Sequence, residues 1–327
     1  NRALTLLARG DFARGLPEYE ARLELAAAAG AASSPATQPT LPRWRGEPIE
    51  TRTLLVETEQ GFGDTLQFMR FVPLARERAA RLVFAVQPEL LPLVEPLGRL
   101  WRVKVVARDE GPVEADLHCP LLSLPLALGT TRDALPAQRR YVDVPVPYKR
   151  RWRGSLGGQS RFKVGVAWSG RIQAHETRSM PVDALAPLFA LAGIDWIVLQ
   201  PVIGEFDAQS LELHARRASI HRYDGRIRDF ADTAAIVERL DAVVSIDTSI
   251  AHLTGALGKP LLLMLPFAAD WRWFTPEPGT TAQSNIAGEA SPWYPSARLV
   301  RQPAPGAWLD VTQAAAELLR RELGLPS

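Results

Sequence analysis

The stretch 241–265, DAVVSIDTSIAHLTGALGKPLLLML, decides the fold class. Two apolar runs of strand length, AVVSIDT and PLLLML, flank SIAHLTGALG, whose apolar residues recur with helical period. Continuous apolar strands joined through a helix are typical of a parallel sheet covered on both faces. The stretch therefore predicts a β–α–β unit of an α/β protein.

The same alternation runs through most of the chain and forms two groups, each with a strand-to-helix turn of small residues. It predicts two Rossmann-like domains, an N-terminal one over residues 47–150 and a C-terminal one over 160–307. Ligands of such domains bind at the carboxyl ends of the strands. The expected strands are TRTLLVET, RLVFAVQ, VKVVAR and ADLHCP in the first domain, and FKVGVAW, DWIVLQP, SIHRYDG, AVVSIDT and PLLLMLP in the second.

Residues 1–30 predict two short helices, with an apolar stripe that begins at Ala3 and resumes at Phe12. The segment resembles the last unit of a tetratricopeptide array, in which small residues let two helices cross closely. A plain helical spacer is the alternative. Residues 31–46 are rich in Ala, Ser, Pro and Thr, and we expect a linker there.

The composition is that of a soluble globular protein, because 46% of the 327 residues are hydrophobic and 23% are charged. The net charge is only +2 and the basic residues are scattered, which argues against a nucleic-acid partner. The single cysteine, Cys119, lies among leucines, so we expect a buried thiol and a reducing, cytoplasmic setting. We expect neither a metal site nor a transmembrane segment, because no His/Cys spacing and no apolar run of roughly 20 residues indicates one.

The first candidate site is the turn EQGFGDT, residues 59–65, between the first strand and first helix of the N-terminal domain. Gly61 and Gly63, on either side of Phe62, permit a tight turn close to a ligand. Asp64 follows where the helix begins. It either caps that helix or acts as the base that deprotonates an acceptor hydroxyl.

The second candidate site is SIDTSIAHL, residues 245–253, where a buried strand enters a helix with a small, polar first turn. The free amides and the dipole of such a helix start suit a pyrophosphate, and nearby hydroxyl and carboxylate groups suit a sugar. An ordinary helix cap followed by a core histidine is the alternative. The candidate binding residues are Asp247, Thr248, Ser249, Ala251 and His252.

The third candidate site follows the first strand of the C-terminal domain, at the sheet edge that also carries Asp247. A guanidinium there would offset the charge of a departing diphosphate, as a metal ion does in other enzymes. Solvated surface is the alternative for the charged residues. The candidates are Trp168, Ser169, Gly170, His175, Arg178 and Gln200.

Two further side chains follow strand ends. Trp271, in PFAADWRW, is a candidate wall over a nucleobase, with core packing as the alternative. His118 is a candidate for reaching an acceptor from the N-terminal side, although its apolar neighbours also favour a core position.

Six segments in this order resemble the glycosyltransferase domain of bacterial tetratricopeptide-repeat glycosyltransferases. That domain is related to the family nine lipopolysaccharide heptosyltransferases and, more distantly, to protein O-GlcNAc transferases. The resemblance extends from about Trp44 to Leu323. The segments are GFGDTLQFMRF, CPLLSLPLALGT, VGVAWSG, DTSIAHLTGALGKP, LPFAADWRWF and SPWYPSARLVRQ.

The resemblance implies a GT-B fold, with two Rossmann-like domains facing a cleft and a last helix, 308–325, that returns to the N-terminal domain. It implies that Asp64 is the base and that the D-T-x-x-x-H-L loop from Asp247 to Leu253 grips a nucleotide-sugar donor. It also implies a metal-independent, inverting transfer to an acceptor hydroxyl of a protein or a glycan, with no other cofactor.

Three features depart from the family pattern. The stretch RIQAHETRSMP after WSG is shorter than the usual Asn-rich one, Ser249 replaces a glycine, and residues 275–290 form a long Gly/Thr/Ser-rich segment for which we expect disorder. Two other functions remain open: a nucleotide-sugar epimerase of the same architecture, and a non-catalytic module that binds a nucleotide sugar or a protein.

Overall fold

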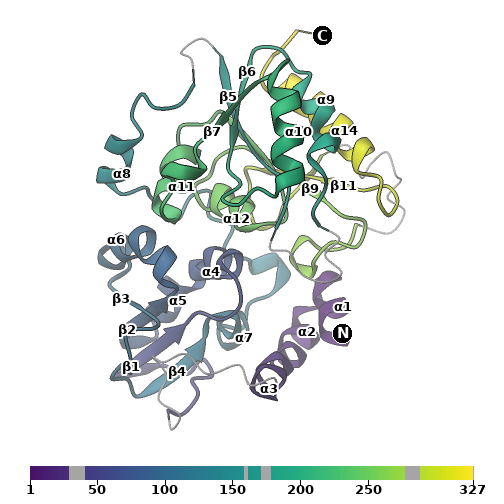
Figure 1. Ribbon diagram of the computed structural model, residues 1–327. Coiled ribbons are helices and arrows are strands. Elements are labelled where there is room, and N and C mark those ends of the chain that lie inside the picture. Colours follow the sequence, from purple (N-terminus) through teal and green to yellow (C-terminus); the bar gives the residue numbers. More distant parts are fainter. Residues whose placement is uncertain (29–40, 158–160, 171–177, 277–287, 327) are drawn as a thin grey trace. The chain divides into compact units, whose positions relative to one another are not determined.

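The computed structural model describes residues 1–28, 41–157, 161–170, 178–276 and 288–326 (Figure 1). The predicted disordered segment 275–290, the linker 31–46 and His175 lie largely or wholly outside the described residues. The chain divides into two compact units. The first unit comprises Asn1–Pro136 and Asp270–Thr275, and the second comprises Ala137–Ala269 and Pro276–Ser327.

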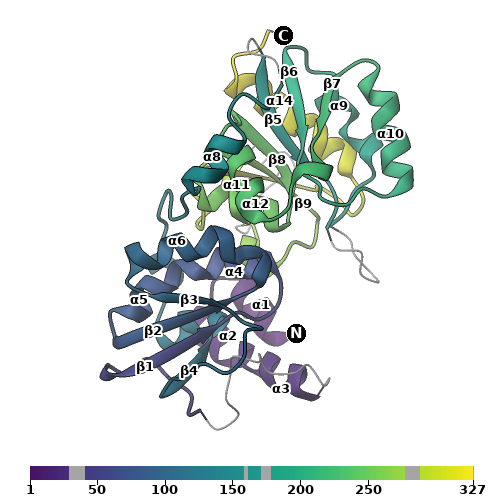
Figure 2. The same cartoon turned by 60° about the vertical axis from the view of Figure 1, so that its left-hand side comes forward.

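The first unit is built on a parallel sheet of four strands in the order β3-β2-β1-β4. All four expected strands are present, because each is a run of apolar residues that the sheet buries. Figure 2 shows α4, α5 and α6 together on one side of this sheet. The elements are β1 (Ile49–Glu57), α4 (Phe62–Phe68), α5 (Val72–Arg76), β2 (Ala79–Val86), α6 (Leu91–Trp101), β3 (Lys104–Ala107), β4 (Leu117–Pro120) and α7 (Leu124–Ala127).

The N-terminal segment forms three helices, α1 (Arg2–Ala8), α2 (Phe12–Tyr19) and α3 (Ala21–Ala28), where two were expected. The helices α1 and α2 cross closely, since a Cβ atom on Gly15 would lie 2.8 Å from the Leu7 side chain. The predicted close crossing at a small residue is thus observed. In α3, Arg22 pairs with Glu59 at 2.7 Å, which fastens this helix to the residues before the Gly61 turn.

The segment Asp270–Thr275 is the part of the first unit that comes from the second half of the sequence. It contains the short 3-10 helix η7 (Trp271–Trp273). The amide of Thr275 donates to the carbonyl oxygen of Ala8 at 2.7 Å, so the segment is tied to α1.

The second unit contains a seven-stranded sheet in the order β10-β11-β9-β8-β5-β6-β7. All its strands pair in parallel except β10, which is antiparallel to β11. The five expected strands are present, whereas β10 and β11 were not foreseen. The strands are β5 (Phe162–Ala167), β6 (Ile194–Val198), β7 (Ser219–Arg222), β8 (Ala242–Ile246), β9 (Leu261–Leu265), β10 (Glu289–Ala290) and β11 (Ala297–Arg301).

Helices cover both faces of this sheet, as the buried, apolar strands require. Figure 1 shows α9, α10 and α14 on one side and α11 and α12 on the other. Successive side chains of the central strands therefore enter apolar layers on opposite faces of the sheet. This is the doubly wound arrangement. The helices are α8 (Val146–Arg151), α9 (Ala186–Phe189), α10 (Glu205–Ala215), α11 (Phe230–Val237), α12 (Ser249–Ala256) and α14 (Trp308–Glu322).

Two boundaries differ from those expected. Residues 137–150 belong to the second unit, where the amides of Tyr141 and Val142 donate to the carbonyl oxygen of Ala256. The helix α14, expected on the N-terminal domain, has its buried face in the core of the second unit, because its apolar stripe packs beside Leu188 and Met264.

Candidate active site

The Gly61 turn of the first unit places a carboxylate at the start of a helix. Gly61 is the residue before α4, and its amide donates to Asp64 Oδ2 at 2.9 Å. Gln60 has a positive φ of 58°, which shows how sharply the chain turns after β1. Asp64 therefore does cap the helix, and its side chain keeps 19% of its surface exposed. Capping and proton transfer are compatible, because a carboxylate has lone pairs for more than two donors.

The second oxygen of Asp64 is paired with an arginine that the sequence had not indicated as a partner. Arg272 Nη2 donates to Asp64 Oδ1, and Arg272 Nη1 donates to Asp270 Oδ1 at 2.8 Å. The guanidinium is 8% exposed and lies 4.8 Å from the centre of the Trp271 ring. Although burial acts against the charged form, Asp270 and Asp64 raise the pKa of Arg272 above its ordinary value.

Trp271, a predicted donor-binding residue, is buried in the first unit. Its ring is 3% exposed and packs edge-on against Tyr19 at 5.7 Å between ring centres, with Phe12 and Phe68 nearby. The alternative of core packing describes this position, since the ring has no open face for a nucleobase. We therefore leave Trp271 out of the donor site.

His118 lies beside a buried glutamate at the carboxyl edge of the first sheet. It pairs in register with Leu55, so it shares a face of the sheet with Glu57, and its Nδ1 lies 3.6 Å from Glu57 Oε1. The His118 side chain is 21% exposed and that of Glu57 is 11% exposed. This edge of the sheet is therefore polar. Glu57 was not among the predicted site residues, although an acidic residue at the end of an apolar strand could have indicated it.

In the second unit, the start of α12 has amides that are open to a ligand. Thr248 precedes the helix with extended backbone, and its side chain makes no capping hydrogen bond. Among the described residues, none accepts a hydrogen bond from the amides of Ser249 and Ile250, whereas the amide of Ala251 donates to the carbonyl oxygen of Thr248. An anion is the partner that such a helix start favours.

Several predicted residues gather around this helix start. Arg178 Nη1 lies 3.4 Å from the carbonyl oxygen of Asp247, and a Cβ atom on Gly170 would lie 3.9 Å from both Arg178 and Thr248. Gln200 is fixed to the same edge, because its amide group exchanges two hydrogen bonds with the backbone of Ser169 at 3.0 and 3.3 Å. The structure thus brings the second and third candidate sites together as one site.

The histidine of this site is held inside the unit. His252 is 4% exposed, its Nδ1 lies 2.9 Å from the hydroxyl of Tyr294, and its Nε2 lies 3.6 Å from Asp247 Oδ1. Its ring therefore lies beside the carboxylate of Asp247 inside the unit. Trp168 is fully buried and donates through its Nε1 to Asp207 at 2.7 Å, so its ring is part of the core and is not exposed to a ligand.

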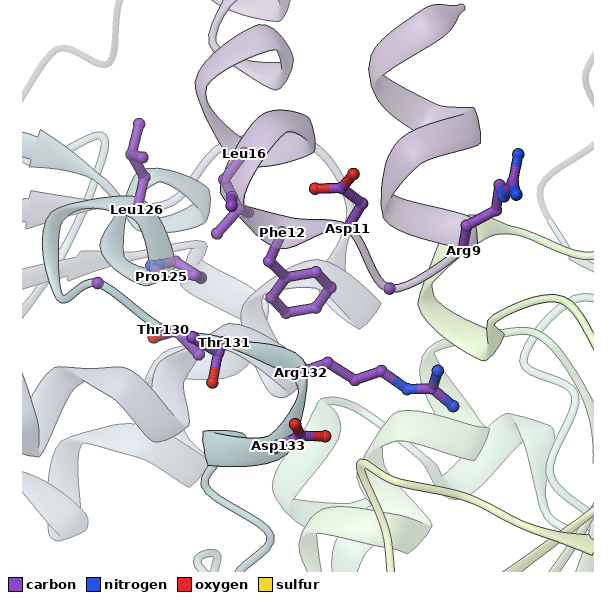
Figure 3. Close-up of a pocket in the computed structure, with 13 residues that line it drawn as sticks. Arg9, Asp11, Phe12, Leu16, Pro125, Leu126, Thr130, Thr131, Arg132 and Asp133 are labelled. Carbon is purple, nitrogen blue, oxygen red and sulfur yellow. The ribbon is translucent and has the colours of Figure 1, made fainter. Parts of the chain in front are cut away.

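A cavity of about 510 Å³ lies elsewhere in the first unit, between the α1–α2 turn and residues 125–133. Figure 3 shows Phe12 pointing toward Thr131 and Arg132 across it. None of the predicted site residues lines this cavity. Across the described ranges, no three His, Cys, Asp or Glu side chains are grouped as metal ligands would be, and no helix has the length and apolar character needed to cross a membrane. Cys119 is free and buried, and burial raises the pKa of its thiol.

The comparisons with known proteins give one relative in sequence and several in structure. No protein-family model matches the chain. Protein FlbA of Caulobacter vibrioides is 25% identical over 341 aligned positions, which cover 98% of this chain and 54% of FlbA. The chain thus spans about half the length of this curated relative.

Three solved structures share the fold. A family 9 glycosyl transferase of Veillonella parvula has a TM-score of 0.51 at 9% identity, over 86% of this chain and 92% of its own. The Escherichia coli ADP-heptose lipopolysaccharide heptosyltransferase II has a TM-score of 0.53 at 14% identity, over 83% and 98%. The iron-containing dodecameric glycosyltransferase TibC of enterotoxigenic E. coli has a TM-score of 0.53 at 10% identity, over 84% and 76%.

At these identities the likeness establishes the fold and no more. The chain is an α/β protein of two Rossmann-like units, with the GT-B fold that was predicted for it.

Proposed function

We propose that the chain is a glycosyltransferase that moves a sugar from a nucleotide-diphosphate sugar to an acceptor hydroxyl. The observation that carries the proposal is the start of α12, where amides that have no acceptor among the described residues lie together with Arg178 and Asp247 at the carboxyl edge of the second sheet. Amides and a guanidinium suit a diphosphate, and the carboxylate suits the hydroxyls of a sugar or ribose. The donor residues are Ser169, Gly170, Arg178, Gln200, Asp247, Thr248, Ser249, Ala251 and His252.

The acceptor side of the proposal lies in the first unit. Asp64 takes the proton of the acceptor hydroxyl as its oxygen attacks the anomeric carbon. The bond from that carbon to the diphosphate breaks, and its electron pair leaves with the nucleotide, whose charge the α12 amides and Arg178 stabilise. A single displacement of this kind inverts the anomeric centre, and in the proposal the α12 amides and Arg178 take the place that a metal ion has in other enzymes. Gly61, Phe62, Gly63 and His118 stay in the proposal as acceptor-side residues.

The fold supports the choice of donor to test first. TibC has been solved in complex with ADP-D-β-D-heptose, with a TM-score of 0.52 to this chain. We therefore propose an ADP-sugar as the first candidate donor, and a protein or glycan as the acceptor. The lone, buried Cys119 fits a reducing compartment, and on that ground we place the reaction in the cytoplasm.

A thermal-shift screen with ADP-, UDP-, GDP- and dTDP-sugars tests the donor. A ligand that binds only the folded chain at 100 times its Kd adds about 2.7 kcal/mol to the free energy of unfolding, which raises Tm measurably. We expect one nucleotide class to raise Tm and the other classes to leave it unchanged. Stabilisation by none of them would remove the proposal.

Product analysis separates transfer from the two other functions. Sugar transferred to an acceptor supports the glycosyltransferase. Conversion of the nucleotide sugar to its epimer, or release of nucleotide without any transfer, would favour the epimerase. Binding without turnover on every acceptor would favour the binding module.

A further inference from the structure

Arg272 is a buried cation placed between two carboxylates of the first unit. It reaches Asp64 through Nη2 and Asp270 through Nη1, and the rings of Trp271 and Phe68 lie 4.8 and 5.6 Å from the guanidinium carbon. Burial of a guanidinium is costly unless partners compensate it. An apolar side chain of similar size would fill the same space without this cost. The buried charge is therefore expected to have a role other than packing.

We propose that Arg272 is a positioning residue for the base Asp64, and that Asp270 neutralises Arg272 while Asp64 holds the proton. The inference rests on the proposed function. It adds two residues, Arg272 and Asp270, that neither the donor site nor the glycine turn includes.

The geometry leaves Asp64 able to accept a proton. Its Oδ2 accepts a hydrogen bond from the Gly61 amide, and its Oδ1 accepts one from Arg272. Two of the roughly four lone-pair directions of the carboxylate are therefore used. The side chain is 19% exposed, which leaves the other directions accessible to a hydroxyl. The two hydrogen bonds hold the side chain in one orientation. Because the base is already oriented, less entropy is lost when the transition state forms.

The charges of the three groups explain why Asp270 is needed. Two carboxylates and one guanidinium carry a net charge of −1 before the reaction. When the acceptor O–H bond breaks, its proton moves to Asp64 and its oxygen bonds to the anomeric carbon. Asp64 is then neutral, and Arg272 keeps Asp270 as its counter-ion at 2.8 Å. No step leaves the buried guanidinium without an opposite charge.

One further ionisable group near Arg272 is Tyr19. The phenol of Tyr19 on α2 also acts on its charge, and the Tyr19 hydroxyl accepts a hydrogen bond from Gln60 Nε2 at 3.2 Å.

The test uses Arg272→Met, Arg272→Lys and Asp270→Asn in the full chain. Loss of the guanidinium makes Asp64 easier to protonate, so the acid limb of the pH–rate profile moves to higher pH in Arg272→Met. Loss of the Asp270 charge does the reverse, so in Asp270→Asn the limb moves to lower pH. In both variants we expect kcat for ADP-heptose to fall about 10-fold or more and Kd for ADP to stay within about 2-fold. Arg272→Lys should recover part of kcat.

A second readout needs no substrate. In protein labelled with ¹³C at the aspartate side-chain carboxyl carbon, the signal of Asp64 is assigned through Asp64→Asn and titrated by NMR. Its titration midpoint should move in opposite directions in Arg272→Met and Asp270→Asn. If ADP-heptose is not turned over while the midpoints still move oppositely, the proposed function fails and the charge arrangement stands.

Arg70→Lys is the matched control. Arg70 is also buried in the first unit, and it donates to the carbonyl oxygens of Gln67 and Pro136. Its variant should lose stability and leave the Asp64 titration unchanged. Midpoints that stay in place, or that move in the same direction in both test variants, overturn the inference. If Arg272→Met does not fold, Asp270→Asn decides the inference. Its midpoint should move to lower pH, and a midpoint that stays in place or moves to higher pH overturns the inference.

Discussion

Two strand-to-helix turns of the molecule, one in each unit, share a backbone plan and differ in charge. In the first unit, β1 enters α4 through Gly61, and the helix start is occupied by the carboxylate of Asp64. In the second unit, β8 enters α12 through Thr248, and the helix start has open amides with Arg178 nearby.

In the proposed mechanism, this difference lets one motif serve two chemical tasks. A helix start that already holds a carboxylate repels an anion, and the same carboxylate is held in place for proton transfer. A helix start with open amides attracts a diphosphate. The position of one acidic side chain, inside the helix at 64 or before it at 247, distinguishes the two turns.

The largest expected effect comes from removing the charge of the first turn. Asp64→Asn keeps the size of the side chain and its amide contact, and we expect kcat to fall about 100- to 10,000-fold because the base is lost. ADP affinity should change little, since the second turn is untouched. Initial-rate kinetics and calorimetric titration measure the two quantities, and unchanged turnover would exclude Asp64 as the base.

A smaller effect should follow when the second turn is made like the first. Ser249→Asp introduces a carboxylate in the first turn of α12, which stabilises the free helix and competes with a phosphate for the same amides. We expect ADP affinity to fall about 100-fold. Ser249→Ala is the control, because it removes only a hydroxyl. Equal affinity for the aspartate and alanine variants would show that the diphosphate does not bind there.

A still smaller effect concerns the cation of the second turn. Arg178→Met removes the guanidinium beside Asp247 and Gly170, and we expect ADP to bind about 10-fold more weakly. Arg178→Lys keeps a positive charge but loses the bidentate geometry of the guanidinium. Its ADP affinity should therefore lie between that of Arg178→Met and that of the unsubstituted chain. A titration at two salt concentrations checks the charge, because the methionine variant should show the weaker salt dependence.

The smallest effect should come from the bond that holds α12 from inside. Tyr294→Phe removes the hydroxyl that lies 2.9 Å from His252 Nδ1. The free energy of unfolding should fall by about 1 kcal/mol, and ADP affinity should stay within about 3-fold. Urea unfolding measures the first quantity. If ADP affinity falls by more than about 3-fold, the α12 helix start depends on the hydrogen bond between Tyr294 and His252.

The strands could be predicted because they are continuous apolar runs. The strand β11, ARLVR, was missed because Arg298 and Arg301 interrupt the apolar pattern at its second and last positions. The break between α2 and α3 was also missed, because the apolar period from Phe12 to Leu23 continues across Glu20 although the helix does not.

The grouping of the proposed donor residues was predictable because they lie close together in sequence or follow strands of one sheet. The partner of Asp64 was not, because Arg272 stands 208 residues away and a charged residue carries no local sign of its partner. The same separation in sequence explains why core packing of Trp271 could not be foreseen. Its place after a strand end suggested a ligand wall, whereas its segment folds back onto the first unit and buries the ring among Phe12, Tyr19 and Phe68.

The return of Asp270–Thr275 to the first unit has a consequence for folding on the ribosome. When Pro136 has been made, the aromatic residues Phe12, Tyr19 and Phe68 still lack the Trp271 ring that covers them. At roughly 5–20 residues per second, the missing segment arrives on the order of ten seconds later. During that interval the nascent chain exposes apolar surface that a chaperone can bind, so the first half of the gene cannot yield a finished first unit by itself.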